Sequence, residues 1–450
     1  MNPVSASQEN NMKKKIAAVS LGCSKNRVDT ELMLGMIPEY EMTDDISRAD
    51  VILINTCGFI EAAKTESIET ILEVSEMRKD GSILIVAGCL SERYRDELER
   101  ELPEVDAFLG IHGYNSIRDA ISEAGMKKHF SEYTDNDSAD FLTRVVTTGS
   151  SYAYVRIADG CDNFCSYCAI PYIRGPYKSR DMNDIESEVR SLVDKGYREI
   201  ILVAQDTSKY GIDLYGRPVL KELLERLSDI DGLIWLRILY SYPEDLTKEL
   251  LDVIVNKKNI VNYIDMPIQH TSDRILEKMN RSSFSVSEKA IELIRSYDTE
   301  FVIRTTILTG FPGEDEEDLE KLKDDIKRIR FDRLGVFAFS SEDGTPAASL
   351  EGQLPSDVKE KRADELMALQ AVISNEKCHE CIGRRYTAVI ENAVDGGYEG
   401  RTEYQVPDVD GILYIKTDRE LTPGSYISVV ITDADDYDLY SVPEDEYENT

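Results

Sequence analysis

Eight cysteines are the residues of this 450-residue chain that could most readily do chemistry. Cys161, Cys165 and Cys168 form a C-x3-C-x2-C spacing within the segment DGCDNFCSYC. Three thiolates in one short loop can bind three corners of a cubane iron–sulfur cluster and leave the fourth iron open to a small molecule. A structural zinc site normally has four protein ligands, and no fourth cysteine lies nearby in the sequence. The spacing therefore predicts a cluster with one open iron. Three incidental thiols in a loop are the alternative interpretation.

A second trio, Cys23, Cys57 and Cys89, is spread along the sequence but repeats one local context. Each cysteine closes an apolar run that is typical of a strand, and each has a glycine beside it. The carboxyl ends of parallel strands meet at one edge of a sheet, in the crevice where open α/β sheets bind ligands. We therefore expect these three thiols to converge as a second metal site. Three small buried residues that end core strands are the simpler alternative.

The remaining pair, Cys378 and Cys381, forms C-x2-C around His379 near the end of a strongly charged predicted helix. A metal site here would lack further ligands, because both other trios are far away in the sequence. We interpret these two residues as ordinary helix thiols.

Polar residues in or after predicted strands are weaker candidates. Arg237 and Arg304 lie in apolar strands, where each must be paired with either a structural carboxylate or the carboxylate of a ligand. Gly310 opens the loop GFPGE, which suits a close backbone approach to a ligand or simply a turn. Gln205 and His270 each end a strand, and a core histidine is the simpler interpretation of the second.

Alternating strands and helices are expected to position the second trio. The strands are 15–23, 51–57 and 83–89, with helices over 29–37 and 60–78 and a further helical pattern after the third strand. Strands separated by helices indicate right-handed βαβ units and a parallel sheet. We therefore predict an α/β domain with a flavodoxin-like parallel sheet over residues 13–130, followed by a polar linker at 132–144.

The same alternation of strands and helices continues over residues 147–380. The expected strands are 152–159, 199–204, 234–240, 261–267, 300–310 and 333–340, and a charged helix at about 356–382 closes the segment. Six βα units predict a partial or complete (β/α) barrel with its chemistry at the carboxyl ends of the strands.

The chain changes character over residues 383–443, where short alternating strands are separated by glycine turns. This pattern predicts a small antiparallel β-barrel. The final residues, PEDEYENT, are expected to fray.

Composition limits the classes of function. Apolar residues make up 42% and charged residues 31% of the chain, and these proportions are typical of globular proteins. The net charge of −34 argues against a general nucleic-acid coat and suits a basic partner. We find no apolar run long enough for a membrane span and no secretion signal, and Met12 is a plausible alternative start. A cytoplasmic location follows, in which the thiols stay reduced.

The first trio, with Tyr167 as the aromatic of C-x3-C-x-aromatic-C, resembles the radical S-adenosylmethionine superfamily. Further segments resemble its methylthiotransferase family, from about Lys13 to Val442, and residues 383–443 resemble that family's TRAM domain. These segments are GCSKNRVDTE (22–31), NTCGFIEAAKTES (55–67), AGCLSER (87–93), IPYIRGPYKSR (170–180), QDTSKYG (205–211), PIQH (267–270) and GFPGE (310–314).

The resemblance implies two 4Fe–4S clusters, one on each trio, and S-adenosylmethionine that is cleaved to a radical able to remove a hydrogen from an unreactive carbon. It implies that the second cluster carries the sulfur, and that the N-terminal domain caps the barrel. We expect Tyr167, Gln205, Arg304 and Gly310 to contact the cofactor, with no side chain acting as a catalytic acid or base. A low-potential electron donor is also required.

The strings G-C-x-K-N-x-x-D and N-T-C-G-F-I-x-x-A resemble the branch that modifies an aspartate β-carbon of small-subunit ribosomal protein twelve. Ser24 stands where proline is common in that branch. Residues 383–450 hold five Lys and Arg against sixteen Asp and Glu. This acidic excess favours a basic ribosomal protein as the partner and disfavours direct RNA binding. A tRNA-modifying enzyme of the same family, an iron–sulfur electron-transfer protein and a nucleic-acid-binding module with structural metal are the alternatives.

Overall fold

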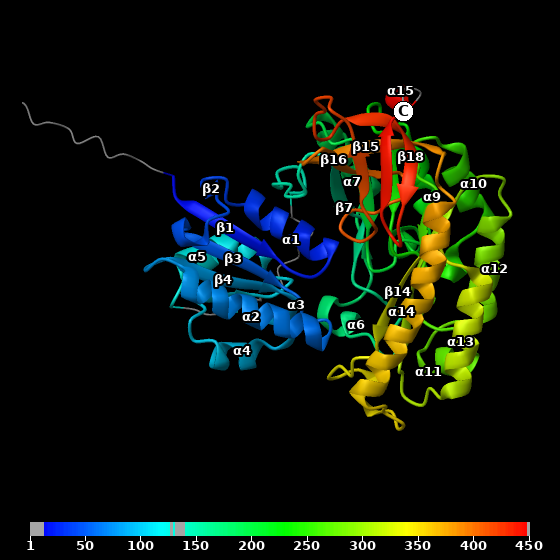
Figure 1. Ribbon diagram of the computed structural model, residues 1–450. Helices are drawn as coiled ribbons and strands as arrows, with labels where there is room; N and C mark the ends of the chain where they lie inside the picture. Colours follow the sequence, from blue (N-terminus) through cyan, green and yellow to red (C-terminus); the bar gives the residue numbers. More distant parts are fainter. Residues whose placement is uncertain (1–12, 127–128, 131–139, 448–450) are drawn as a thin grey trace, which may run out of the picture. The chain divides into compact units, whose positions relative to one another are not determined.

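The computed structural model describes residues 13–126, 129–130 and 140–447 (Figure 1). The first eleven residues and most of the predicted linker, 132–139, lie outside that range. The chain divides into two compact units, Met1–Thr147 and Thr148–Thr450.

The first unit is built on a six-stranded parallel sheet in the order β2-β1-β3-β4-β5-β6, which contains the flavodoxin-like order 2-1-3-4-5 and confirms the predicted fold class. The strands are β1 (Lys15–Ser20), β2 (Glu41–Met42), β3 (Val51–Thr56), β4 (Ile83–Gly88), β5 (Ala107–Leu109) and β6 (His129–Phe130). All six residues of β3 are buried, because helices cover both faces of such a sheet. The helices are α1 (Ser24–Gly35), α2 (Glu61–Met77), α3 (Cys89–Arg93), α4 (Arg95–Glu101) and α5 (Ile117–Ser122).

The second unit begins with a partial barrel of parallel strands, as the sequence predicts. Two three-stranded sheets, β11-β10-β7 and β12-β13-β14, are joined by a single parallel bridge between Leu236 and Ile260. The strands are β7 (Tyr152–Arg156), β10 (Glu199–Val203), β11 (Trp235–Ile238), β12 (Tyr263–Asp265), β13 (Val302–Thr309) and β14 (Arg333–Ala338). A short pair, β8 (Ala158–Asp159) and β9 (Lys178–Ser179), lies after β7.

Helices pack outside these strands because each has one apolar face toward the sheet. They include α7 (Met182–Asp194), α9 (Leu220–Ser228), α10 (Lys248–Asn256), α12 (Phe284–Arg295), α13 (Glu316–Ile329) and the long α14 (Ser356–His379), with the short α6 (Ile170–Arg174), α8 (Ile212–Tyr215) and α11 (Asp273–Lys278) in the connections.

The unit ends in a closed five-stranded barrel in the order β15-β16-β17-β19-β18. Its strands are β15 (Arg385–Val394), β16 (Gly397–Thr402), β17 (Leu413–Lys416), β18 (Tyr426–Ala434) and β19 (Leu439–Pro443). Four neighbouring pairs are antiparallel and the β17–β19 pair is parallel. A closed ring with an odd number of strands cannot alternate direction throughout, so one parallel pair is a topological requirement.

The prediction that the last residues fray is wrong for residues 444–447. They form a helical turn, α15 (Glu444–Tyr447). Arg385 donates to Glu444 at 2.7 Å and Arg419 donates to Asp445 at 2.7 Å, so ion pairs to the barrel hold the acidic turn in place. Alternating-residue reasoning does not detect such long-range charge pairs.

The small barrel contacts the first residues of three strands of the partial barrel. Glu199, the first residue of β10, accepts from Arg401 of β16 at 2.8 Å, and Tyr263, the first of β12, donates to Asp410 at 2.7 Å. Trp235, the first of β11, packs edge-on against Tyr426. The small barrel therefore covers the amino-terminal end of the partial barrel and leaves its carboxyl-terminal end available for chemistry.

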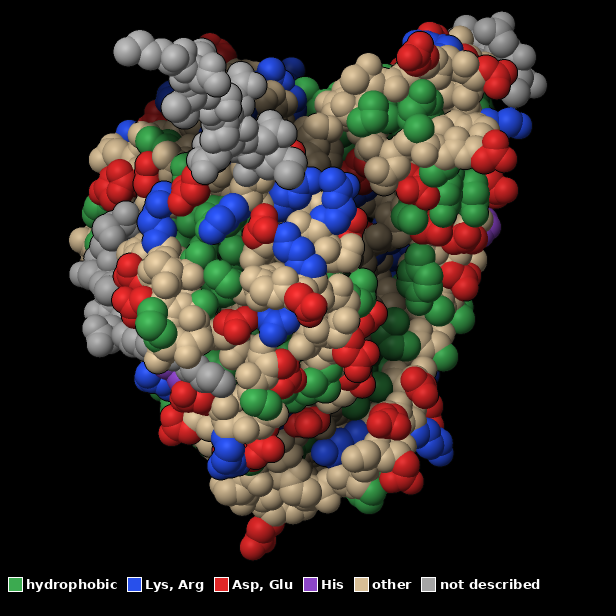
Figure 2. Space-filling view, turned by 90° about the vertical axis from the view of Figure 1, so that its left-hand side faces the viewer, with side chains coloured by type: hydrophobic (Ala, Val, Ile, Leu, Met, Phe, Trp, Pro, Cys, Tyr) green, Lys and Arg blue, Asp and Glu red, His purple; other side chains and the backbone are tan. Residues whose placement is uncertain are grey.

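No helix in the described ranges is both long enough and apolar enough to cross a membrane. The face drawn in Figure 2 shows acidic and basic side chains interspersed, with a group of Lys and Arg side chains near its middle.

Candidate metal centres

The three cysteines of the first unit follow neighbouring strands, as the sequence predicts. Cys23 precedes α1 after β1, Cys57 directly follows β3, and Cys89 directly follows β4 and begins α3. β3 lies between β1 and β4 in the sheet, so the three turns are adjacent at one edge.

Two glycines let these turns pack against each other without intervening side chains. A Cβ on Gly22 would lie 2.7 Å from Cys57 Cβ and 3.0 Å from its Sγ, and Gly22 has a φ of +82° that favours glycine. A Cβ on Gly58 would lie 2.7 Å from Leu90 Cα and 3.0 Å from the carbonyl carbon of Cys89. The turn that carries Cys57 and Gly58 thus contacts the turn of Cys23 on one side and the turn of Cys89 on the other.

Asn26, in the first turn of α1, joins the three turns through its side chain. Its Nδ2 donates to Leu21 O at 3.1 Å and to Thr56 O at 3.0 Å, just before Cys23 and Cys57 respectively. Its Oδ1 lies 3.7 Å from Cys89 Sγ. One fully buried amide therefore fixes the backbone or sulfur of all three cysteine-bearing turns.

Cys161, Cys165 and Cys168 lie in the loop between β8 and α6, beyond the carboxyl end of β7. The Cys161 N–H donates to Gly175 O at 3.1 Å, and the Cys168 N–H donates to Cys165 O at 2.9 Å. Asp159 accepts from Arg174 at 3.1 Å and thereby ties the start of this loop to the end of α6. These hydrogen bonds make the loop compact.

The turn between α11 and α12 supports the same loop from outside. Ser166 donates from its N–H to Met279 O at 3.0 Å and from its hydroxyl to Lys278 O at 2.7 Å. Asn280 Nδ2 donates to the carbonyl of Phe164 at 3.1 Å. These bonds fix the loop to an element more than 100 residues away in the sequence.

Burial suppresses ionisation of two of the loop thiols, Cys161 and Cys168. It raises the pKa of Cys161 to about 11, and burial together with the neighbouring Cys165 raises the pKa of Cys168 to about 12. A metal centre removes this cost, because a coordinating thiol is deprotonated by the charge of the metal. The donor set, three thiols close enough to interact in a water-poor loop, fits an iron–sulfur cluster.

In the described ranges, no group of three or more His, Cys, Asp and Glu side chains is arranged around the position of a single metal ion. A cubane cluster instead binds each cysteine through a separate iron.

Cys165 has an aromatic and cationic environment. Tyr242 Oη lies 3.6 Å from Cys165 Sγ, and Tyr167 is also hydrogen-bonded to Cys165. Arg281 stacks on the Tyr242 ring at 4.1 Å from its centroid. Burial, and then repulsion from the neighbouring Cys165, raise the pKa of both tyrosines, so both hydroxyls keep their protons.

Gln205 lies just after β10, at the carboxyl end of the partial barrel. Both polar atoms of its side-chain amide are buried, and neither has a hydrogen-bond partner among the described residues. The neighbouring Asp206 accepts from Asn163 of the cysteine loop at 2.9 Å. An unpaired buried amide beside this loop fits a polar ligand that supplies the missing bonds.

Protein groups account for the other candidate residues. Arg304 donates to Asp265 at 2.9 Å and Arg237 donates to Glu199 at 2.9 Å, so both have the structural pairing that the sequence left open. A Cβ on Gly310 would lie 2.6 Å from Lys359 Cγ, so this glycine permits close packing against α14.

His270 is a buried structural residue. Its Nδ1 accepts from the N–H groups of Thr271 and Ser272, both at 2.9 Å, and its Nε2 lies 3.5 Å from Glu314. This arrangement agrees with the simpler interpretation drawn from the sequence.

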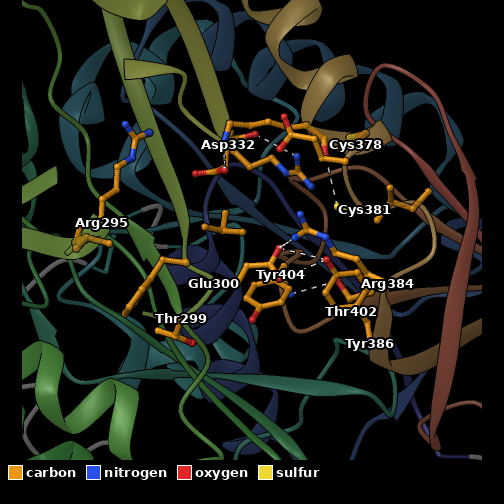
Figure 3. Close-up of a pocket in the computed structure, with 17 residues that line it drawn as sticks. Arg295, Thr299, Glu300, Asp332, Cys378, Cys381, Arg384, Tyr386, Thr402 and Tyr404 are labelled. Carbon is orange, nitrogen blue, oxygen red and sulfur yellow. Dashed lines mark hydrogen bonds and ion pairs between the residues drawn. The ribbon is translucent and has the colours of Figure 1, made fainter. Parts of the chain in front are cut away.

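Cys378 lies in the last turn of α14 and Cys381 follows its end. Cys378 packs into the core of the small barrel, and both thiols line a cavity of about 270 Å³ (Figure 3). The charged groups around this cavity already pair with each other, as in Arg384 with Glu300 at 2.9 Å and Lys377 with Asp332 at 2.5 Å.

Asn26, Asn280, Tyr242 and Arg281 are site residues that sequence reasoning missed. Their types are common on loops and helix ends, and only the fold brings them to the cysteines. The string KNR in the first cysteine segment is the one sequence signal that includes any of them, through Asn26.

Three family descriptions match the chain in order. Residues 15–110 match the uncharacterised protein family UPF0004, residues 155–326 match the radical SAM superfamily, and residues 382–443 match the TRAM domain.

Curated relatives match over almost the whole chain. The ribosomal protein uS12 methylthiotransferase RimO of Acetivibrio thermocellus is 46% identical, over 95% of this chain and 98% of the relative. The protein with the same name from Clostridium tetani is 45% identical, over 96% and 98% respectively.

Among solved structures, the radical S-adenosylmethionine methyltransferase TsrM from Kitasatospora setae has a similar fold. The TM-score is 0.55 at 14% sequence identity, over 82% of this chain and 90% of that one. At this identity the likeness concerns the fold alone.

Proposed function

The chain belongs to the ribosomal protein uS12 methylthiotransferase family of radical S-adenosylmethionine enzymes, and from this membership we propose that it adds a methylthio group to the β-carbon of an aspartate in uS12. The observation that carries the proposal is the identity of 46% over 98% of a relative with that activity in its name. The two separate cysteine trios provide the ligands for the two iron–sulfur clusters that such a transfer requires.

Two 4Fe–4S clusters and S-adenosylmethionine are the cofactors, and when bound they would pass on an electron from an external donor and supply the radical, the sulfur and the methyl group. Cys161, Cys165 and Cys168 would hold the cluster that binds S-adenosylmethionine. Cys23, Cys57 and Cys89 would hold the second cluster.

The chain's own residues bind, orient and exclude water. The cysteine loop follows the carboxyl end of β7, and the small barrel contacts the amino-terminal residues of the strands at the opposite end. We propose that Gln205 and Tyr167 contact S-adenosylmethionine at the carboxyl ends of the strands. For Arg304 and Gly310, a cofactor contact would have to share a side chain or backbone already engaged by Asp265 or Lys359.

We assign three functional segments to this activity: residues 13–130 to the second cluster, 147–380 to the radical chemistry and 383–443 to partner binding. The acidic character of residues 383–450 supports a Lys- and Arg-rich protein partner over direct RNA binding. A low-potential donor would supply electrons, and a cytoplasmic location would give access to the ribosomal substrate.

The test is an anaerobic reaction of the reconstituted enzyme with S-adenosylmethionine, a reductant and purified uS12. We expect the mass of uS12 to rise by one methylthio group minus one hydrogen, on a single aspartate. A parallel reaction with bulk tRNA separates the alternative activity of the same chemistry, and it should leave tRNA unmodified.

Cleavage of S-adenosylmethionine is measured in the same reactions. Cleavage without modification of uS12, together with a modified adenosine in tRNA, would contradict the proposed substrate. Absence of cleavage by a fully loaded enzyme would instead favour an electron-transfer protein.

A further inference from the structure

The loop cysteines differ in what their sulfur atoms contact. Cys161 and Cys168 accept from backbone N–H groups, those of Asn163 and Ile170 respectively. Cys165 instead faces the hydroxyl of Tyr242 at 3.6 Å. This tyrosine comes from another part of the barrel, the connection between β11 and α10.

Tyr242 is held at Cys165 from two sides. Its backbone N–H donates to Ser208 Oγ at 3.2 Å, and its ring carries the Arg281 guanidinium at 4.1 Å. Arg281 in turn donates to Pro267 O at 2.7 Å. The hydroxyl and the guanidinium are therefore positioned together by groups outside the cysteine loop.

Hydrogen bonds to the ligand sulfurs and nearby charge are two of the factors that set the reduction potential of an iron–sulfur cluster. A phenol is a donor to a thiolate, and a guanidinium is always cationic. Both interactions stabilise the more negative, reduced state more than the oxidised state. Each therefore makes the cluster easier to reduce.

We propose that Tyr242 and Arg281 act as positioning residues that raise the reduction potential of the cluster on Cys161, Cys165 and Cys168. This inference rests on the proposed function, because it needs a cluster at that loop. It assigns neither residue to the reacting atoms of the substrate. It goes further by naming which groups of the chain control the electron-accepting step.

The test is a potentiometric titration followed by electron paramagnetic resonance. The full-length chain carries Cys23→Ala, Cys57→Ala and Cys89→Ala, so that only the loop cluster contributes to the signal. In that background we expect Tyr242→Phe to lower the ratio of reduced to oxidised cluster at fixed potential by about tenfold, which is about 59 mV for one electron. Arg281→Gln should shift it in the same direction, and Arg281→Lys less.

Tyr210→Phe is the matched control. Tyr210 is a fully buried tyrosine in the same barrel, and its hydroxyl donates to Arg180 O at 2.9 Å rather than to a cysteine. We expect this variant to keep the parent potential.

An unchanged potential in Tyr242→Phe, with the full count of iron retained, would overturn the inference. Loss of the iron in that variant would also overturn it, since the hydroxyl would then hold the cluster rather than tune it. Failure of the parent protein to bind iron at this loop would count against the proposed function instead.

Discussion

Asn26 shows how one residue that is not a metal ligand can organise three that are. Hydrogen bonds of its side-chain amide reach the backbone before Cys23 and Cys57 and the sulfur of Cys89. Asn55 adds to this network by donating to Asn26 O at 2.7 Å. Removal of the amide would leave buried carbonyl groups without their donor.

Asn26→Ala is therefore expected to lower the free energy of unfolding of the first unit by about 1–3 kcal/mol. It should also reduce the iron content after reconstitution from about eight to about four per chain, because only the cluster in the second unit would form. Denaturant unfolding and iron analysis check the two effects.

Asn262→Ala is the control for this substitution, because the Asn262 amide donates to Thr299 on an exposed surface. It should keep the full iron content. Retention of about eight irons by Asn26→Ala would show that the three turns find their positions without this amide.

The residue type, spacing and position of the six cysteines identified them in the sequence, but the groups around them were not identified. A thiol trio has few uses, so its spacing and its place after strands are informative. An asparagine, tyrosine or arginine has many, and Asn26, Tyr242 and Arg281 gain their roles only from tertiary contacts. For Arg304 the sequence left two pairings open, and the Asp265 carboxylate is the one present.

At the scale of elements, glycine at the strand–helix turns decides how closely the cysteines approach. Gly22→Ala would place a methyl group 2.7 Å from Cys57 Cβ in addition to straining a left-handed backbone. We expect a loss of about 1–2 kcal/mol from the backbone strain and a further loss from the clash. Iron content should fall toward that of a single cluster.

Gly81→Ala separates the two causes, since Gly81 has a φ of +78° with nothing within 4 Å of an added Cβ. It should show the strain alone and bind iron normally. Equal effects of the two substitutions on thermal unfolding and on iron would contradict the packing explanation.

The contact between the partial barrel and the small barrel depends on the buried Glu199, which pairs with Arg401 and Arg237. Burial alone would raise the pKa of Glu199, but the two guanidiniums outweigh it and hold the pKa below its ordinary value. Breaking such a buried pair from one side typically costs about 3–5 kcal/mol. We expect Arg401→Ala to destabilise the second unit by that amount in denaturant unfolding.

Because the folded-state pKa of Glu199 is lowered, its contribution is present above the ordinary glutamate pKa of about 4.3 and is lost as the pH falls below it. Glu199→Gln should therefore differ from the parent most at neutral pH and least in acid. Asp252→Asn, which breaks an exposed pair with Lys248, should change stability little at any pH. A constant difference between Glu199→Gln and the parent across pH would contradict this assignment.

At the scale of the whole molecule, the positions of most strands along the chain were predictable, but the shortest strands and the parallel pair of the small barrel were not. Apolar runs such as VILINT mark buried parallel strands, and all six strands of the partial barrel follow from this pattern. β2 and β6 have two residues each and carry no periodic signal. The parallel β17–β19 pair arises from ring closure, which no local pattern records.

Charge acts at this scale as well. The net charge of −34, with five basic and sixteen acidic residues in 383–450, predicts that uS12 binds through complementary charge. The affinity for uS12 should therefore fall steeply as salt is raised, as measured by equilibrium binding at several ionic strengths. Affinity for bulk tRNA should be weak at every salt concentration, and strong salt-dependent tRNA binding would contradict the assignment of the partner.

The proposed activity requires two separate clusters, each held by three cysteines, and iron counting tests this requirement most directly. The chain and its Cys23→Ala and Cys161→Ala variants are reconstituted without oxygen, and iron and sulfide are counted per chain. We predict about eight irons in the parent chain and about four in each variant. A parent chain with about four irons, or a Cys23→Ala variant that keeps about eight, would contradict the account.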